Sequence, residues 1–479
     1  MNLLPLLSRW LGVDNVQAGD RSASAKLFTL LSRRYPALAR SIRHQIQGSP
    51  AVTITRIERA EVATDQLWGA KLEAAHAGNL GQYSVTITGW AVTRRVAIRD
   101  IRVYCDQMVV ASGSLDRKHA DLAKHLPDVP EPEHSGFLIR VNTLGLRPQY
   151  DLRVVVVLKN RANILLGTVH CKQKPLQIRF RPALNPILVT FFGRTGSTWL
   201  MRLLLEHPKI LVYPRYPYEI RPMRYWLHML RVLSAPADHR YSTKPTGFMK
   251  NEYWIGSNPY LPLLKADASF HRWLGQQYTE KLARFCLESI ETFYQHIARI
   301  AGRNNAVYFA EKIHPEVATG LLRQLYPRLC EIILVRDPRD ILASVISFNA
   351  KRGRVGFGYS QYNSPVEYLT YLKARMAIQA EMYQTNPERS YLLRYEDLIL
   401  RPTETLTGLL TYLGLDASPG TVAGMLERAS QDNEQMQRHR TSESPAQSIG
   451  RWKRDLTPEL QESARSVLGD VLKTLGYEA

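Results

Sequence analysis

Cysteine is scarce in this sequence, with four residues in 479. They are far apart, and none lies in a Cys-x-x-Cys pair or at metal-ligand spacing from a histidine. This spacing argues against a zinc site and against a disulfide framework. Because isolated thiols are usual in a reducing compartment, we predict a cytoplasmic protein. The four residues are Cys105, Cys171, Cys286 and Cys330.

Long apolar runs are also missing. No stretch reaches the roughly 18 apolar residues that a membrane-spanning helix needs. Residues 1–11 are largely apolar but carry no basic n-region and no clear cleavage site. We therefore predict neither export nor a membrane span.

Acidic residues are fewer than basic residues, which favours an anionic ligand. Lys and Arg number 63 against 43 Asp and Glu, so the formal net charge is +20. This charge suits an acidic glycan, a nucleic acid, another polyanionic ligand or an anionic membrane surface, and does not choose among them. A hydrophobic fraction of 45% is typical of a folded protein, and 479 residues predict two or three domains.

Residues 1–48 form the first of three predicted segments. Apolar clusters alternate there with arginines such as Arg33 and Arg40, a pattern typical of basic amphipathic helices. We favour a helical arm that packs on its own protein, because the apolar stripe is short for a membrane anchor. A peripheral membrane contact is the alternative interpretation.

In the second segment, residues 50–175, the spacing of apolar residues changes from about four to two. Short β-rich runs such as 83–90 and 152–158 are separated by Asp, Gly, Pro and Asn. This pattern predicts a smaller antiparallel β-sandwich domain. Residues 172–185, rich in Lys, Arg, Gln and Pro, form the predicted linker to the third segment.

The third segment, residues 186–479, alternates apolar strand candidates with helical patterns. The strand candidates are 187–192, 306–310, 331–337 and 391–395. Strands separated by helices predict βαβ units, and therefore a parallel sheet with helices on both faces. We predict an α/β domain of the P-loop-like class.

The first candidate anion site follows the first strand of this domain. The apolar run 187–192 passes into Gly193-Arg-Thr-Gly-Ser197 and then into helically spaced leucines. A strand, a tight loop and a helix in this order point backbone N–H groups at an anion. Arg194 adds a cation, and Ser197 and Thr198 add hydroxyl donors. The alternative is a glycine-rich turn capped by Ser and Thr, without a ligand.

The second candidate anion site follows the third strand. Arg336 lies at the predicted carboxyl end of that strand, where open α/β sheets bind ligands. A helix that begins near Pro338 places Ser344 about two turns in, so a guanidinium and a hydroxyl could converge on one anion. Taken alone, Arg336-Asp-Pro-Arg-Asp340 could equally be a charged helix cap with internal ion pairs.

Together, these two motifs resemble the sulfotransferase family, whose members use 3′-phosphoadenosine 5′-phosphosulfate (PAPS) as the donor. The spacing from Arg336 to Ser344 matches the family pattern. Two later stretches agree, 393–398 and 448–453, and the second closes over the nucleotide in this family. The resemblance covers about residues 186–479 and leaves the first two segments outside it.

The resemblance implies roles for individual residues. The first motif would hold the 5′-phosphosulfate through Arg194, Thr195, Gly196, Ser197, Thr198 and Trp199. The second would hold the 3′-phosphate through Arg336 and Ser344, and the late stretch adds Gly450, Arg451, Trp452 and Lys453. Arg194 and Lys312 would stabilise charge on the transferring group. No carboxylate or histidine cluster suggests a metal.

The implied reaction is sulfuryl transfer to a hydroxyl, and we expect the acceptor to be a glycan, a glycolipid or a related molecule. Cytosolic small-molecule sulfotransferases carry Lys at the position of Arg194, so the sequence resembles the bacterial carbohydrate- and protein-directed branches more closely. A P-loop kinase is poorly supported, because the loop lacks the GxxxxGK[ST] pattern. We expect no specific nucleic-acid partner. The alternative function is a non-catalytic protein that binds an acidic glycan or a nucleic acid.

The acceptor hydroxyl must lose a proton, which requires a base within reach. In the carbohydrate- and tyrosine-directed branches this base is a glutamate beyond a His-Pro pair, and Glu219 after His207-Pro208 fits. In the cytosolic branch it is the histidine of a Lys-x-His run, and Lys312-Ile-His314 fits. We favour Glu219, with His314 next and Glu311 third. If neither residue is the base, we expect Glu219 to pair with a neighbouring arginine, Arg215 or Arg221, and His314 to cap a strand end.

Overall fold

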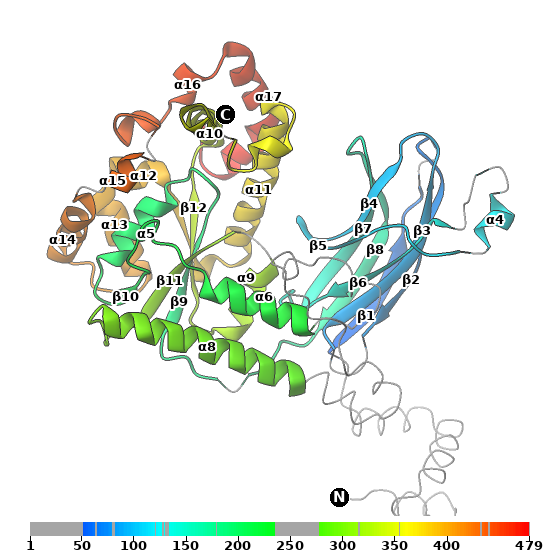
Figure 1. The fold of residues 1–479 in the computed structure, drawn as a ribbon, viewed down its shortest axis with the longest axis horizontal. Coiled ribbons are helices and arrows are strands. Elements are labelled where there is room, and N and C mark those ends of the chain that lie inside the picture. The colour runs from blue at the N-terminus through cyan, green and yellow to red at the C-terminus, as the bar shows by residue number, and fades with distance from the viewer. Residues whose placement is uncertain are drawn as a thin grey trace, which may run out of the picture.

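A computed structural model places most of the chain from residue 51 onwards. It describes residues 51–62, 65–78, 82–119, 121–126, 129, 134–178, 180–234, 277–314, 317–353, 355–431, 434–438 and 441–478. The predicted helical segment 1–48 lies outside these residues. Figure 1 shows two units side by side, an antiparallel β unit in blue and cyan and an α/β unit in green to red.

The first unit consists of two antiparallel sheets, with strand orders β1-β8-β7-β4-β5 and β2-β3-β6. Residues of both sheets, such as Val85, Ile101 and Val154, are fully buried in one shared core. The alternation of apolar and polar residues along each strand therefore forms a sandwich, as predicted. Its elements are β1 (Val52–Arg59), β2 (Leu67–Ala77), β3 (Ser84–Thr93), β4 (Ile98–Cys105), β5 (Met108–Gly113), α4 (Leu122–His125), β6 (Gly136–Asn142), β7 (Gln149–Leu158) and β8 (Asn163–Gln173).

The second unit contains a parallel sheet with the strand order β10-β11-β9-β12-β13. The four strands expected from the sequence are present, and a two-residue edge strand is added that is too short to show a period. The strands are β9 (Asn185–Thr190), β10 (Ile210–Leu211), β11 (Tyr308–Ile313), β12 (Cys330–Val335) and β13 (Ser390–Arg394).

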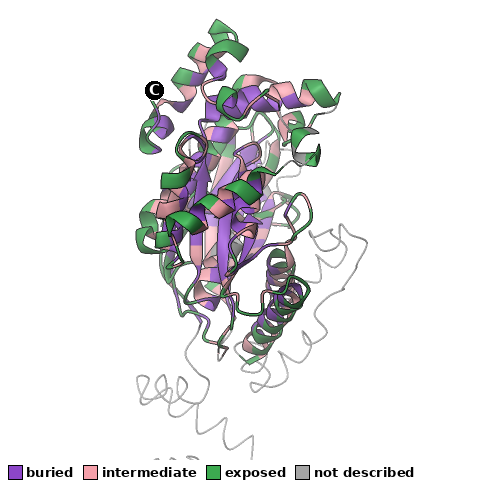
Figure 2. Ribbon diagram, turned by 90° about the vertical axis from the view of Figure 1, so that its left-hand side faces the viewer, coloured by how far each residue is buried: buried purple, intermediate pink, exposed green. Residues whose placement is uncertain are grey.

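Helices cover both faces of this sheet, which confirms the predicted fold class. Ile187, Val189 and Ala310 face one apolar layer, built with α5 (Ser197–Leu205), α12 (Tyr395–Leu400), α13 (Pro402–Tyr412) and α14 (Pro419–Ser430). Leu188 and Phe309 face the other side, with α6 (Pro222–Ser234), α8 (Tyr278–Ile300) and α9 (Val317–Leu325). Figure 2 shows the strands as a buried layer with exposed helices outside it.

The remaining helices pack around β12 and the chain end. Ile333 and Val335 of β12 share an apolar cluster with α10 (Pro338–Arg352), α11 (Pro365–Thr385), α16 (Trp452–Asp455) and α17 (Pro458–Thr474). The short α15 (Glu434–Arg438) follows α14. No helix in the described part of the chain combines the length and apolar character needed to cross a membrane.

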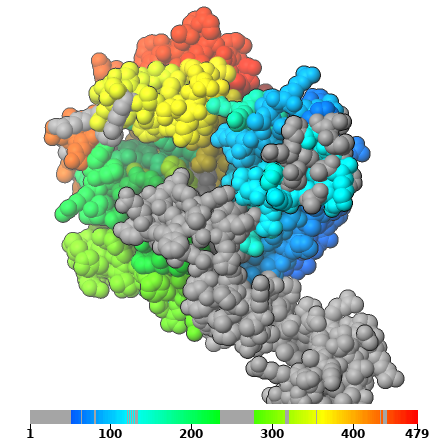
Figure 3. Space-filling model, turned by 45° about the vertical axis from the view of Figure 1, so that its right-hand side comes forward, coloured from blue at the N-terminus to red at the C-terminus, as the bar shows by residue number. Residues whose placement is uncertain are grey.

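The two units contact one another through both apolar and polar groups, since Leu144 and Leu146 of the sandwich belong to the same apolar cluster as Met223 of α6. Arg161 of the sandwich pairs with Glu367 of α11 at 2.6 Å, and Asn142 donates to the Arg231 carbonyl of α6 at 2.7 Å. In Figure 3 the yellow residues of α11 lie beside the blue and cyan sandwich. Among the described residues, none from the sandwich lines the large cavity of the α/β unit. The sandwich therefore leaves the carboxyl edge of the parallel sheet open.

Candidate active site

A cavity of about 810 Å³ opens at the carboxyl edge of the parallel sheet, a volume usual for small-molecule sites. The loops that follow the strands of this sheet all begin at this edge, because parallel strands end on the same side of a sheet. The cavity brings together residues far apart in the sequence. Of the residues singled out from the sequence, it is lined by Arg194, Gly196, Ser197, Thr198, Trp199, Glu219, Lys312, Arg336 and Ser344.

The loop between β9 and α5 has the geometry of an anion cradle. Thr195 is buried, and its Oγ1 donates to the Phe192 carbonyl at 2.8 Å, which closes the turn. Gly196 has φ 86°, and a Cβ there would lie 2.4 Å from the ring of Tyr395. Only glycine suits this position. Because the residue before α5 has no capping side chain, the first N–H groups of the helix are available to an anion.

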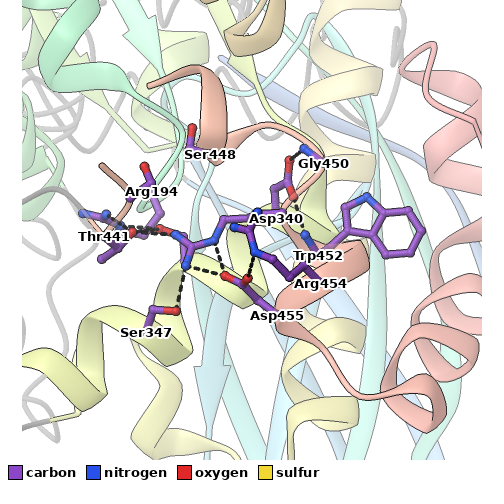
Figure 4. A network of polar contacts seen from close by, with 12 residues as sticks. Arg194, Asp340, Ser347, Thr441, Ser448, Gly450, Trp452, Arg454 and Asp455 are labelled. Atoms are coloured by element: carbon purple, nitrogen blue, oxygen red, sulfur yellow. Dashed lines mark hydrogen bonds and ion pairs between the residues drawn. The ribbon is translucent and has the colours of Figure 1, made fainter. Parts of the chain in front are cut away.

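Arg194 connects the first motif to the second. Its Nε donates to Ser344 Oγ at 2.9 Å, and one Nη donates to Thr441 Oγ1 at 3.3 Å. Thr441 also accepts from Arg451 at 2.8 Å, so one neutral hydroxyl lies between two guanidinium groups (Figure 4). Burial, and then the charge of Arg336, lowers the pKa of Arg194 to about 10. Concentrated positive charge of this kind favours an anionic ligand.

Arg336 ties two loops together at the same place. It donates to the Arg194 carbonyl at 2.8 Å and to the Ser448 carbonyl at 2.5 Å, and its guanidinium lies 4.6 Å from the centre of the Tyr395 ring. Its Nε is buried and finds no hydrogen-bond partner in the described residues. A buried donor without a partner is costly, and an anion in the cavity would satisfy it.

The late basic stretch 448–453 is anchored to α10, and only its first residue, Ser448, lines the cavity. Asp340 accepts from the backbone N–H groups of Gly450 at 2.8 Å and Trp452 at 3.0 Å, as Figure 4 shows. Arg451 donates to Ser347 and Asp455 as well as to Thr441. Four of the predicted nucleotide contacts therefore do not line the cavity: Gly450, Arg451, Trp452 and Lys453.

Glu219 and Lys312 form an ion pair inside the cavity, with Oε2 and Nζ 3.1 Å apart. The Lys312 ammonium also donates to Thr198 Oγ1 at 3.1 Å and to the Pro217 carbonyl at 3.2 Å. Burial and the charge of Arg221 lower the pKa of Lys312 to about 7. The carboxylate opposes this shift, and burial is the larger effect. Glu219 also pairs with Arg221, so two cations hold its charge.

The two other candidate bases lie elsewhere. His314 Nδ1 is 3.2 Å from the Phe191 carbonyl, its ring stacks on Phe191, and it does not line the cavity. Burial and then Arg221 lower the pKa of His314 to about 4, so the ring is neutral near pH 7. Glu311 faces the opposite side of β11 from Lys312, because alternate residues of a strand point to opposite faces.

Glu311 belongs to the core under α6 and α8. Its Oε1 accepts from the Tyr294 hydroxyl at 2.7 Å and from the Met223 N–H at 3.0 Å. Burial raises the pKa of Glu311 to about 8. Both contacts keep this carboxyl group away from the cavity, so its perturbed pKa reflects its place in the core.

Tyr395, Thr441 and Phe357 are among the cavity residues that had no role assigned from the sequence. Tyr395 lies within the stretch 393–398, whose pattern identified the family but no function for the ring. Thr441 and Phe357 carry no local signal, because their importance comes from contacts with Arg194 and Gly193. In the described part of the chain, no group of His, Cys, Asp and Glu side chains is arranged to hold a metal.

Solved structures similar to this chain include sulfotransferases. The sulfotransferase domain from the Synechococcus PCC 7002 olefin synthase has a TM-score of 0.36 and 17% identity, and the match covers 64% of this chain and 100% of that chain. Mouse sulfotransferase SULT7A1 complexed with PAP has a TM-score of 0.34 and 11% identity, and the match covers 62% of this chain and 86% of that chain.

Comparison of sequences finds relatives that include the following two proteins. Nodulation protein NoeE of Sinorhizobium fredii is 21% identical over 314 residues, which cover 61% of this chain and 66% of that protein. Carbohydrate sulfotransferase 1 of Danio rerio is 27% identical over 159 residues, which cover 31% of this chain and 38% of that protein. The chain thus spans less than two thirds of either relative. Residues 186–419 match the model of the sulfotransferase family. Within its α/β unit, residues 186–419 are therefore similar to the sulfotransferase family.

Proposed function

We propose that this protein transfers a sulfuryl group from PAPS to a hydroxyl of a glycan, a glycolipid or a related acceptor. The observation that carries the proposal is one cavity lined by both anion motifs and by the Glu219–Lys312 pair. The glycan is suggested by the name of one relative, a carbohydrate sulfotransferase. A non-catalytic polyanion-binding protein is less well supported, because it would not need a carboxylate and an ammonium paired beside the anion cradle.

The residues present suit a nucleotide with two separate anionic ends. The 5′ end would lie on the α5 N-terminus, beside Thr198 and Lys312. The 3′-phosphate would lie near Arg336 and Ser344. The Nε of Arg336, which has no hydrogen-bond partner among the described residues, would gain an acceptor there. The donor supplies an activated sulfur–oxygen bond.

The chain's own residues would then move a proton and balance charge. Glu219 would accept the proton of the acceptor hydroxyl as the new oxygen–sulfur bond forms. The bond from sulfur to the bridging oxygen breaks, and adenosine 3′,5′-bisphosphate leaves with the electron pair. Lys312 would stabilise the charge on that oxygen. Because Glu219 pairs with Lys312 in the structure, attraction of Lys312 by the donor would leave Glu219 with a single ion pair among the described residues, to Arg221, and would thereby favour its action as a base.

Selective binding of adenosine 3′,5′-bisphosphate is the first expected result. At equal concentration it should raise the melting temperature far more than AMP does, since AMP lacks the phosphate that would meet Arg336. Differential scanning fluorimetry over a range of nucleotide concentrations measures this. Equal shifts for the two nucleotides would instead support the polyanion-binding alternative.

Loss of the Arg336 guanidinium should remove this selectivity. In Arg336→Ala we expect the affinity for the bisphosphate to fall by about 10- to 100-fold, because a charge-assisted contact is worth roughly 1.5 to 3 kcal/mol. AMP affinity should change much less, and this comparison within one variant controls for general loosening of the loops. Calorimetric titration of both nucleotides provides the numbers. An equal loss for both would make Arg336 only a structural tie between the two loops.

The cellular location is also a proposal. All four cysteines are free, and Cys105, Cys171 and Cys286 are buried. Free thiols are usual in a reducing compartment, so we propose a cytoplasmic protein.

A further inference from the structure

We propose that Phe357 and Tyr216 form an aromatic acceptor subsite that takes one pyranose ring of a glycan. This inference rests on the proposed function, since it concerns the acceptor side of the same cavity. Both residues line that cavity, and neither belongs to an anion motif.

Phe357 is held at the cavity at a conformational cost. Its φ is 56°, in the left-handed region that bulky residues rarely adopt, and such backbone positions cluster at ligand-binding sites. Phe357 is 38% exposed, whereas Phe348, whose ring centre is 5.1 Å from that of Phe357, is buried. The Tyr368 hydroxyl donates to the Phe357 carbonyl at 3.1 Å. The local structure therefore keeps a large apolar ring at the surface of the cavity.

The loop after β9 makes room for this ring. A Cβ on Gly193 would lie 2.5 Å from Cδ1 of Phe357, so the ring packs directly on the backbone of the first anion motif. The guanidinium of Arg194 lies 5.8 Å from the centre of the Phe357 ring. Phe357 is thus next to Arg194, to which the family resemblance assigns the transferring group.

Tyr216 lies close to the proton-transfer groups. It precedes Pro217, whose carbonyl accepts from Lys312 at 3.2 Å, and it is three residues before Glu219. Burial raises the pKa of the Tyr216 phenol, so the hydroxyl remains a hydrogen-bond donor near neutral pH. The two aromatic residues therefore lie near both ends of the proposed reaction, the Glu219 base and the Arg194 cation.

This chemistry fits a sugar ring better than an open chain. One face of a pyranose carries several C–H bonds, which pack flat on the electron-rich face of an aromatic ring, while its hydroxyls point outward to polar groups. An open-chain polyol has the same hydroxyls but no such face. The ring of Phe357 should therefore make the protein prefer a pyranose acceptor to an open-chain polyol, whichever donor is bound.

The test compares sugar and open-chain acceptors in matched variants. Transfer of labelled sulfate from PAPS is measured to chitotetraose, cellotetraose, maltotetraose and sorbitol. For the best tetrasaccharide, Phe357→Ala should raise KM about tenfold, with bisphosphate affinity within about twofold of wild type. Phe357→Tyr should restore KM, because it keeps the ring. Val355→Ala is the control, since Val355 is 56% exposed in the same loop and does not line the cavity.

Several outcomes would overturn the inference. These are an unchanged KM in Phe357→Ala, equal use of sorbitol and the tetrasaccharides by the wild type, or no tetrasaccharide accepting sulfate while the bisphosphate still binds. In these cases the proposed donor site would stand. Failure of the wild type to bind the bisphosphate would remove the proposed function itself. Melting temperatures of the variants identify any that misfold, and Phe357→Leu then replaces Phe357→Ala as a variant of similar bulk without the ring.

Discussion

Replacing Glu219 with glutamine is expected to lower kcat by at least about 10²-fold, because a positioned base typically contributes about 10²- to 10⁴-fold. Glutamine has nearly the same shape as glutamate and cannot accept the proton. Glu219 is the only one of the three candidate bases that lines the cavity. Donor affinity should change little, since the expected anion contacts come from other residues. Steady-state kinetics with saturating donor measure kcat, and calorimetry measures donor binding.

His314→Ala is the matched control for this variant. His314 donates to the Phe191 carbonyl and stacks on its ring, so its loss should disturb the loop without removing the base. We expect kcat to remain within about tenfold of wild type, because no proton-transfer contribution is lost. If Glu219→Gln stays active and His314→Ala does not, the two roles are the reverse of our assignment.

Removal of the Lys312 ammonium is expected to have a comparable effect. In Lys312→Ala, kcat should fall by about 10²- to 10³-fold, the usual loss when one charge-stabilising donor is deleted from an active site. The Nζ is within 3.2 Å of Thr198, Pro217 and Glu219, so the side chain is fixed before any ligand binds. Single-turnover kinetics separate this loss from an effect on product release.

The pH dependence of donor binding provides an independent check on Lys312. Its pKa in the free protein is about 7, so above pH 7 the side chain is mostly neutral. An anionic donor favours the ammonium and raises this pKa, so binding takes up a proton and should weaken as pH rises from about 7 to 9. Below pH 7 the side chain is already charged, and this dependence should disappear. Lys312→Met should lack the dependence above pH 7, and a variant that keeps it would assign the proton to another group.

Much of the fold follows from local patterns in the sequence. Period-two apolar runs indicate the sandwich strands, and continuous apolar runs indicate β9, β11, β12 and β13. Both signals act over a few residues, so they can be read without knowledge of the partners. The residue types and spacing of the two anion motifs identified the family in the same way, because a strand, a loop and a helix N-terminus form a local unit.

The choice among residues of the site depended on the tertiary structure. Glu311, Lys312 and His314 are almost adjacent in the sequence, yet only Lys312 lines the cavity, since strand alternation and the contacts of Tyr294 and Phe191 direct the other two away. The sequence ranks these residues by type and order, but it does not show which of the two buried faces of β11 points to the cavity.

Other features of the site arise from contacts between distant segments. Arg194 and Thr441 are 247 residues apart in the chain and share a hydrogen bond. Phe357 matters because Gly193 leaves room for its ring. The sequence by itself determined the two kinds of domain, the family and the two anion motifs, whose signals are local. The resemblance also assigned both motifs and Glu219 to one active site. Only the packing of the parallel sheet decided that Phe357 and Thr441 join them in one cavity and that Glu311 and His314 do not line it, because long-range contacts leave no periodic trace in the chain.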